Sequence, residues 1–208
     1  MLNPDSEILN LELPLMEDFY TIQGEGKHSG RAAYFLRIGG CDVGCVWCDV
    51  KESWDKNLHP ETSIDAMLKP ILESKTDFVV ITGGEPAMYD LNPLLNALHA
   101  NNIYVAIETS GAYEVMGDID WFCLSPKKFK MPVDSAYKSA DEFKVVIYHP
   151  SDFEWAEKQT ALLRDDCELF LQPEWSKTEQ LLPKIIDYVK QNPKWRISLQ
   201  THKFMNIP

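Results

Sequence analysis

Short apolar runs alternate with stretches of helical spacing along most of the chain. Runs typical of strands lie at residues 32–38, 77–82, 103–108, 121–125, 142–147, 168–173 and 195–200. Helices are predicted from 62 or 63 to about 74, from 90 past Leu98, from 151 to about 163 and from 178 to 190. Pro183 is awkward inside the last helix and predicts a kink or a later start. Residues 1–18 are expected to form an irregular lead-in.

Strands that alternate with helices imply a parallel sheet built from βα units. A length of 208 residues suits one domain with a substantial core. Functional groups in such folds gather at the carboxyl ends of the strands. Polar or cysteine residues follow five of the predicted strands, at 39–41, 82–85, 108–110, 125–127 and 172–173. We therefore expect an active site at this edge of the sheet.

The composition is that of a globular protein and excludes several classes. Hydrophobic residues make up 45% of the chain and charged residues 25%, unlike a disordered chain. The net charge is −12 with no basic stripe, which argues against a general nucleic-acid binder. No apolar run approaches ~18 residues and the amino terminus lacks a basic start, so neither a membrane span nor a targeting signal is expected. We expect a cytoplasmic protein that binds neither nucleic acid nor membrane.

Three of the five cysteines lie close together, in the sequence CDVGCVWC. Cys41, Cys45 and Cys48 follow the first predicted strand with the spacing Cys-x3-Cys-x2-Cys. Three thiolates in one loop can ligate a [4Fe–4S] cluster and leave one iron without a protein ligand. A zinc site of three cysteines and one histidine is the alternative, although none of the five histidines has an obvious spacing. Cys123 and Cys167 lie in or beside strand patterns and are expected in the core.

The cysteine loop resembles the radical S-adenosylmethionine (SAM) superfamily, as do Trp47 before its last cysteine and GGEP after the next strand. Further stretches resemble the 7-carboxy-7-deazaguanine synthase family within it. They are YTIQGEG with SGR, CVWCDVKESWD, IETSG with LSPK, and WRISLQTHKFMNIP. The last stretch is the most specific, because few families share QTHK followed by Asn-Ile-Pro. The resemblance implies a shortened parallel α/β partial barrel over residues 1–208, with the tail at 201–208 folding into the active site.

The resemblance also implies an activity. A member of this family converts 6-carboxy-5,6,7,8-tetrahydropterin to 7-carboxy-7-deazaguanine, with ring contraction and release of ammonia, in queuosine and deazapurine biosynthesis. The [4Fe–4S] cluster and SAM carry the chemistry, and a radical derived from SAM takes hydrogen from the pterin carbon that bears the carboxylate. No side chain is therefore expected to be catalytic. The family suggests a homodimer and the reaction needs an electron donor such as a flavodoxin. The alternatives are a radical SAM activase acting on a partner protein and, outside the superfamily, a non-enzymatic zinc module.

Site residues follow from the matching motifs. The cluster ligands are Cys41, Cys45 and Cys48. The residues expected at SAM are Trp47, Asp49, Thr82, Gly83, Gly84, Glu85, Glu108 at the ribose, Ser125 and Lys127. The residues expected at the pterin are Gln23, Gly24, Glu25, Arg37 at the carboxylate, Gly84, Gln172, His202 and the terminal carboxylate of Pro208.

Taken without the resemblance, several of these residues have simpler explanations. Gly83 and Gly84 suit a plain turn after a strand, and Glu85 suits a surface loop. Arg37 could form an exposed salt bridge, although it lies in an apolar strand beside the cysteine loop. A single histidine such as His202 is more often structural than functional.

Val50 departs from the family pattern. The family often has threonine at this position as a magnesium ligand, whereas valine has no oxygen for a hard cation. Magnesium could then contact only substrate and water, take another oxygen of the protein, or be dispensable. The departure bears on the magnesium ion and leaves the cluster expectation unchanged.

Overall fold

The computed structural model describes residues 11–208, and its strands form one nine-stranded sheet in the order β3-β1-β2-β4-β5-β6-β7-β8-β9. The strands are β1 (Glu12–Ile22), β2 (Ala32–Ile38), β3 (Glu61–Ser63), β4 (Phe78–Gly83), β5 (Tyr104–Thr109), β6 (Trp121–Leu124), β7 (Glu142–Ile147), β8 (Glu168–Pro173) and β9 (Trp195–Ile197). Along the sheet, neighbours from β2 to β9 run parallel, while β1 runs antiparallel to β2 and β3. Because β3 and β9 end the sheet without pairing to each other, the barrel is partial, as predicted.

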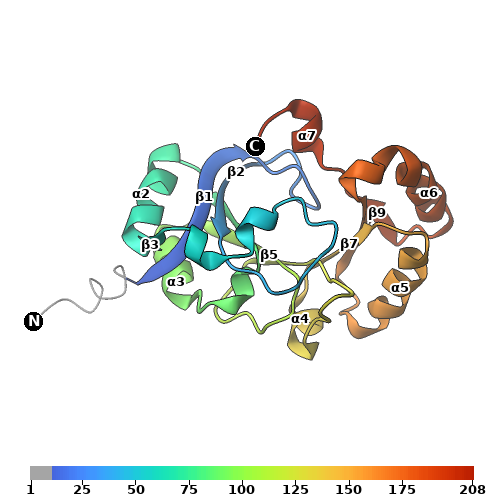
Figure 1. Cartoon of the computed structure of the whole chain (residues 1–208), viewed down its shortest axis with the longest axis horizontal. Helices are drawn as coiled ribbons and strands as arrows, with labels where there is room; N and C mark the ends of the chain where they lie inside the picture. Colours follow the sequence, from blue (N-terminus) through green and yellow to red (C-terminus); the bar gives the residue numbers. More distant parts are fainter. Residues whose placement is uncertain (1–10) are drawn as a thin grey trace, which may run out of the picture.

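Helices connect most of the parallel strands and lie on the outer face of the sheet (Figure 1). The α-helices are α2 (Ile64–Ser74), α3 (Asn92–Ala100), α4 (Asp134–Ser139), α5 (Ser151–Gln159), α6 (Thr178–Gln191) and α7 (Thr201–Met205). Single 3-10 turns are η1 (Lys51–Ser53), η2 (Lys56–Leu58), η3 (Pro86–Met88), η4 (Thr160–Leu162) and η5 (Trp175–Lys177). Residues 110–120, between β5 and β6, contain no helix. A loop thus replaces one barrel helix, which is how a short chain can keep this fold.

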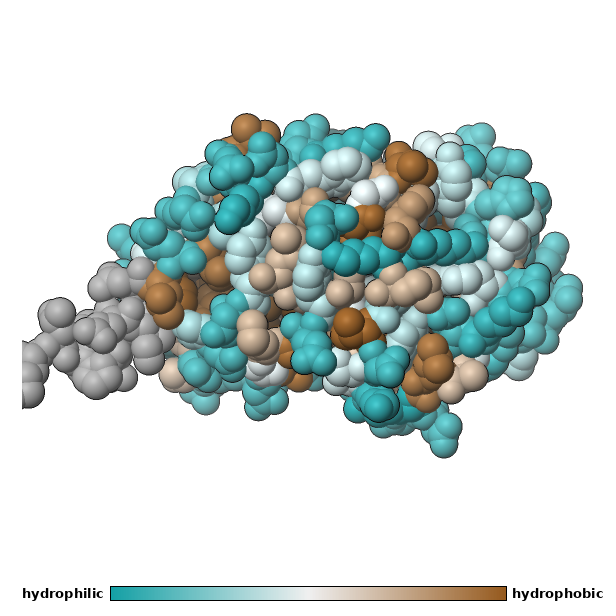
Figure 2. All heavy atoms as spheres, turned by 60° about the horizontal axis from the view of Figure 1, so that its bottom comes forward, coloured by the Kyte–Doolittle hydropathy of each residue, from teal (hydrophilic) through white to brown (hydrophobic). Residues whose placement is uncertain are grey.

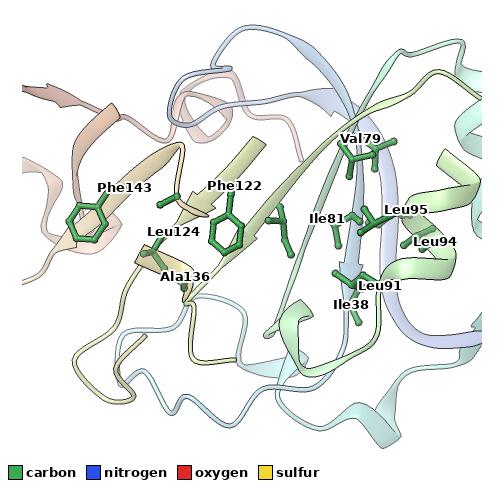
Figure 3. Close-up of a cluster of buried hydrophobic side chains, with 14 of the residues drawn as sticks. Ile38, Val79, Ile81, Leu91, Leu94, Leu95, Phe122, Leu124, Ala136 and Phe143 are labelled. Carbon is green, nitrogen blue, oxygen red and sulfur yellow. The ribbon is translucent and has the colours of Figure 1, made fainter. Parts of the chain in front are cut away.

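The main core fills the space between the sheet and its helices. Ile38 and Ile81 point from β2 and β4 toward Leu91 and the leucines of α3, and all of these side chains are fully buried (Figure 3). Each buried leucine or isoleucine contributes about 1.5–3 kcal/mol to folding. Successive side chains of a strand point to opposite faces, so this packing directs Arg37 and Thr82 into the barrel.

The inner face of the barrel changes character along the strands. Near their amino ends, the inward side chains of Phe78, Val80 and Ala106 form a small buried apolar cluster. Further along the strands, the inward positions that line the cavity include the charged residues Glu108 and Lys144. The apolar end closes the barrel, and the polar end is left for a ligand.

The expected lead-in is wrong for residues 12–18, which belong to β1; residues 1–10 lie outside the described part of the chain. The segment mixes acidic and apolar residues and contains Pro14, which hid the strand. Leu13 and Leu15 are buried, and β1 takes its hydrogen bonds from β2 and β3, with a bulge after Leu15. Pairing with distant strands therefore decides this element, not local propensity.

Helix ends agree with the sequence in part. Ser63, one of the two positions predicted for the start of α2, caps this helix by accepting a hydrogen bond from the amide of Ala66 at 3.3 Å. Of the two alternatives given for Pro183, a kink or a later start, the later start is wrong, because α6 begins at Thr178 and includes Pro183. Packing of its buried face outweighs the backbone hydrogen bond that proline removes. Further along, β9 ends at Ile197, three residues earlier than expected.

Figure 2 shows one face of the molecule, on which hydrophilic residues predominate. On the face drawn in Figure 2, the hydrophobic residues lie in separate small groups among hydrophilic ones. This pattern agrees with a net charge of −12. Within residues 11–208, every helix is too short or too polar to cross a bilayer.

Candidate active site

A cavity of about 270 Å³ opens at the carboxyl ends of the parallel strands. The cysteine loop, the loop after β1 and the chain after β9 form its walls. Among the residues nominated from the sequence, those lining it are Gln23, Gly24, Glu25, Arg37, Cys41, Cys45, Trp47, Cys48, Asp49, Thr82, Gly83, Gly84, Glu108, Ser125, Lys127, Gln172, His202 and Pro208. The structure thus brings nearly the whole nominated set together, while the ligand that each residue contacts stays a prediction.

The three cysteines of the loop lie together in a small cluster with Val43 and Ala112. All three are free thiols, and burial raises the pKa of Cys45 to about 11. Within residues 11–208, no group of three or more His, Cys, Asp and Glu side chains is arranged to hold a single metal ion. An iron–sulfur cluster has a different requirement, because each cysteine binds a different iron and the thiolates remain apart. The donors therefore fit a polynuclear cluster better than zinc.

Backbone proximity explains the glycines of GGEP. A Cβ on Gly83 would lie 2.2 Å from the carbonyl oxygen of Ile38, and one on Gly84 would lie 2.3 Å from that of Gly40. The amide of Gly84 donates to Ile38 O at 3.1 Å, and the amide of Glu85 donates to Gly40 O at 2.8 Å. The two glycines let β4 approach the start of the cysteine loop closely. They are therefore more than a plain turn, because they set the position of the loop.

Glu85 is the exception among the nominated residues, because it is fully buried and does not line the cavity. Its carboxylate accepts hydrogen bonds from the amides of Ala87 at 3.0 Å and Ser110 at 2.8 Å. The hydroxyls of Thr109 and Ser110 also donate to it. In this structure Glu85 fastens the end of β5 to GGEP. It is not the surface acid that a loop position suggests, and its contact with SAM stays a prediction.

The loop after β1 and the tail form one wall of the cavity. The amide of Thr201 donates to Gly24 O at 3.0 Å, and Gln200 Nε2 donates to Glu25 Oε1 at 2.9 Å. A Cβ on Gly24 would lie only 2.3 Å from Nδ1 of His202, so the histidine packs directly over the glycine. The motifs QGEG and QTHK, far apart in the sequence, therefore act as one structural unit.

The tail also crosses to the cysteine loop. Lys203 Nζ lies 2.8 Å from Oδ2 of Asp49, the residue that directly follows the last cysteine of the loop. Thr21 Oγ1 donates to the carbonyl of Pro208 at 3.3 Å, and Pro208 lines the cavity. Figure 1 shows α7 and the carboxyl terminus at the β1–β2 end of the barrel. These contacts join the tail to the cysteine loop and to β1.

Arg37 offers an anion-binding group at the cavity wall. Its Nε donates to Glu17 Oε1 at 2.6 Å, so it does form a salt bridge, but its side chain is only 19% exposed. The other guanidinium nitrogens make no hydrogen bond within residues 11–208. They can therefore bind a carboxylate on a ligand in bidentate fashion.

Burial shifts the pKa values of two other groups that line the cavity, Lys127 and His202. Lys127 Nζ donates to the carbonyl and the hydroxyl of Ser125, and burial lowers the pKa of Lys127. Burial also lowers the pKa of His202, so its imidazole is neutral near pH 7. A neutral imidazole can donate at one nitrogen and accept at the other, which suits a heterocycle with both donors and acceptors.

Sequence reasoning missed Lys144, which is 3% exposed and lines the cavity from β7. Its ammonium lies 2.5 Å from Glu25 Oε2 and 3.0 Å from Glu108 Oε2. The signal was present, because a lysine interrupts the apolar run EFKVVI of a strand that is otherwise buried.

Comparisons with known proteins agree with this geometry. The model of the Radical SAM superfamily matches residues 36–144. A 7-carboxy-7-deazaguanine synthase from Flavobacterium psychrophilum is 60% identical, covering 94% of this chain and 93% of its own length. A synthase of the same name from Synechocystis sp. is 43% identical over 99% of both chains. The crystal structure of QueE from Escherichia coli superposes with a TM-score of 0.84 at 30% identity, covering 96% of this chain and 99% of that one. The chain therefore belongs to the radical SAM superfamily and, within it, to the 7-carboxy-7-deazaguanine synthase family.

Proposed function

We propose that this chain converts 6-carboxy-5,6,7,8-tetrahydropterin to 7-carboxy-7-deazaguanine, contracting a six-membered ring and releasing ammonia. One observation carries the proposal: a single cavity joins the cysteine loop to the wall made by QGEG and the tail. The cysteine loop is shared across the superfamily, whereas the wall made by QGEG and the tail matches the synthase family. The names of the relatives given above state the same product, 7-carboxy-7-deazaguanine.

Membership of the superfamily implies a [4Fe–4S] cluster and SAM as cofactors. When bound, they supply a carbon-centred radical that removes a hydrogen atom from the substrate. The protein's own residues bind, orient and shield these groups. Cys41, Cys45 and Cys48 would hold the cluster, and the tail, joined to Asp49 by the ion pair of Lys203, would shield it from water.

The part of the cavity wall away from the cysteine loop suits the pterin. Arg37 would pair with its carboxylate, since a guanidinium fork matches that group. Gln172 accepts a hydrogen bond from Ser198 Oγ at 2.7 Å, which leaves its amide NH₂ for an acceptor on the ring. Glu25 and His202 supply an acceptor and a neutral imidazole on the same side. These residues would fix the ring so that the carbon bearing the carboxylate faces the cofactor.

Turnover by the anaerobically reconstituted protein tests the proposal. With SAM, a reductant and the carboxypterin, mass spectrometry should detect a product that has lost ammonia. Unchanged pterin, with SAM consumed only when a protein partner is added, would support an activase instead. Colourless protein that contains zinc would support the zinc module.

We also propose that magnesium, if it acts, has no ligand at position 50. Val50 lines the cavity and presents no side-chain oxygen, while the hydroxyl of neighbouring Ser53 donates to the carbonyl of Val50 at 2.7 Å. Turnover measured after chelation is therefore expected to depend weakly on added magnesium. A strict requirement would show that losing this oxygen did not remove the metal site.

A carboxy-terminal tag is expected to reduce turnover more than an amino-terminal one. Pro208 lines the cavity, so residues added after it must displace the tail or enter the substrate site. The expected loss is about tenfold or more, on the scale of a misplaced substrate contact. Kinetics of the two tagged forms, each compared with the untagged protein, check this. Equal activity would contradict a substrate contact at Pro208.

Three further features belong to the proposal. A flavodoxin would supply the electron, a homodimer would be the assembly, and the cytoplasm would be the location. The family resemblance supports the first two, and a cluster loop with free thiols suits a reducing compartment. Reduction of the reconstituted protein by purified flavodoxin tests the electron donor, and sedimentation tests the homodimer.

A further inference from the structure

Lys144 carries the one charged group on β7 that reaches the cavity wall between the two expected ligand sites. Its Nζ bridges Glu25, on the loop expected at the pterin, and Glu108, on the strand expected at the SAM ribose. Glu25 also accepts from Gln200, and Glu108 accepts from Gln23 Nε2 at 2.9 Å. Each carboxylate is therefore held by two donors, and Lys144 is common to both.

The electrostatics of this group depend on all three charges. Burial alone would lower the pKa of Lys144, but Glu108 and Glu25 outweigh it and hold that pKa well above its usual range. Burial alone would raise the pKa of Glu25, but Lys144 outweighs it and lowers that pKa to about 2. The lysine is thus charged, and it keeps Glu25 ionised inside the protein.

We propose that Lys144 is a positioning residue that holds Glu25 and Glu108 in place for the pterin and for SAM. The proposal rests on the function proposed above, which assigns the two carboxylates to those ligands. Lys144 touches both carboxylates, and its ammonium is paired with them and not with a free anion-binding position of the cavity. Its role is to make the two halves of the site depend on one buried cation.

Other groups cannot replace this cation. The titratable and charged groups that act on Lys144 or on one of the two carboxylates are Cys123, Lys127, Glu142 and His202. The ammonium of Lys127 already donates to the carbonyl and the hydroxyl of Ser125, and burial lowers its pKa. His202 has a lowered pKa and is neutral near pH 7, and the ammonium of Lys203 pairs with Asp49. Without Lys144, burial and Glu108 would both raise the pKa of Glu25.

Lys144→Met keeps most of the length of the side chain and removes its ammonium group. The affinities for the pterin and for SAM, measured by calorimetry on the reconstituted protein, are each expected to fall about 10- to 100-fold. Glu25→Gln should weaken the affinity for the pterin. The affinity for SAM should stay within about twofold of wild type, because Lys144 and Gln23 still hold Glu108. Lys158→Met is the matched control, since Lys158 forms an exposed pair with Glu154, and it should change neither affinity.

The pH profile separates positioning from a general loss of structure. Between about pH 8 and about pH 7, the wild-type affinity for the pterin should be flat, because Glu25 stays ionised and His202 stays neutral. In Lys144→Met the affinity should fall as the pH falls, because Glu25 takes up a proton. Lys144→Arg should restore the flat profile. If Lys144→Met alone fails to fold, the double variant Lys144→Met with Glu108→Gln removes the repulsion between the carboxylates of Glu25 and Glu108. Its affinity for the pterin should still fall as the pH falls.

Two outcomes decide the proposal. Wild-type affinities and a flat profile in Lys144→Met would overturn it. If the wild-type protein binds SAM and not the pterin, the proposed function is wrong. The inference about Lys144 is then judged by its effect on SAM affinity alone.

Discussion

Replacing Cys45 with alanine is expected to reduce turnover by about a thousandfold or more, because the radical chemistry belongs to the cluster and SAM. Cys45 is buried beside Val43 and Ala112, in the same small cluster as the other two cysteines of the loop. With two thiolates left, the protein should hold little or no four-iron centre. Visible absorption and iron content after anaerobic reconstitution measure the loss of the cluster, and product formation measures the loss of turnover.

Cys167→Ala is the matched control for this experiment. Cys167 lies in the main core beside the amino end of β8 and is absent from the cavity wall. Its loss should lower the free energy of unfolding by about 1 kcal/mol and leave cluster content and turnover near wild type. Full cluster content and turnover in Cys45→Ala would contradict the assignment of Cys45 as a ligand.

Replacing Arg37 with alanine is expected to raise KM for the carboxypterin by about 30-fold to about a thousandfold, the cost of leaving a desolvated carboxylate unpaired. Arg37→Lys should recover only part of this loss, since an ammonium keeps the charge and loses the fork. Steady-state kinetics with saturating SAM measure both effects, and the affinity for SAM should not change.

A tetrahydropterin that lacks the carboxylate provides the sharpest control. Wild type and Arg37→Ala should bind this analogue equally, because the group that Arg37 recognises is missing. Arg164→Ala removes a surface arginine paired with Asp141 and Asp166, and should affect neither ligand. An equal loss of affinity for the carboxypterin and the analogue in Arg37→Ala would contradict carboxylate recognition.

The parallel part of the fold could be predicted because its strands are local apolar runs followed by turn residues. β4 and β5 illustrate this, since their runs agree with the sequence within one residue. β1 could not be predicted in this way, because its hydrogen bonds come from β2 and from the short strand β3. The information that makes it a strand lies in other parts of the chain.

The site shows the same division. The cysteine spacing and GGEP are local, and the structure places both at one cavity. The pairing of Lys144 with Glu25 spans 119 residues, so no local pattern could reveal the partner, although an isolated lysine in an apolar strand was a visible signal. The position of Glu85 depends on Thr109 and Ser110, which a loop motif does not specify.

The most direct test of the account follows the hydrogen atom. The account holds that one cavity brings SAM and the pterin carbon bearing the carboxylate into contact. The reconstituted protein, given SAM, a reductant and carboxypterin carrying deuterium at that carbon, should form 5′-deoxyadenosine that contains the deuterium, together with 7-carboxy-7-deazaguanine. Unlabelled 5′-deoxyadenosine with the pterin recovered intact would contradict it.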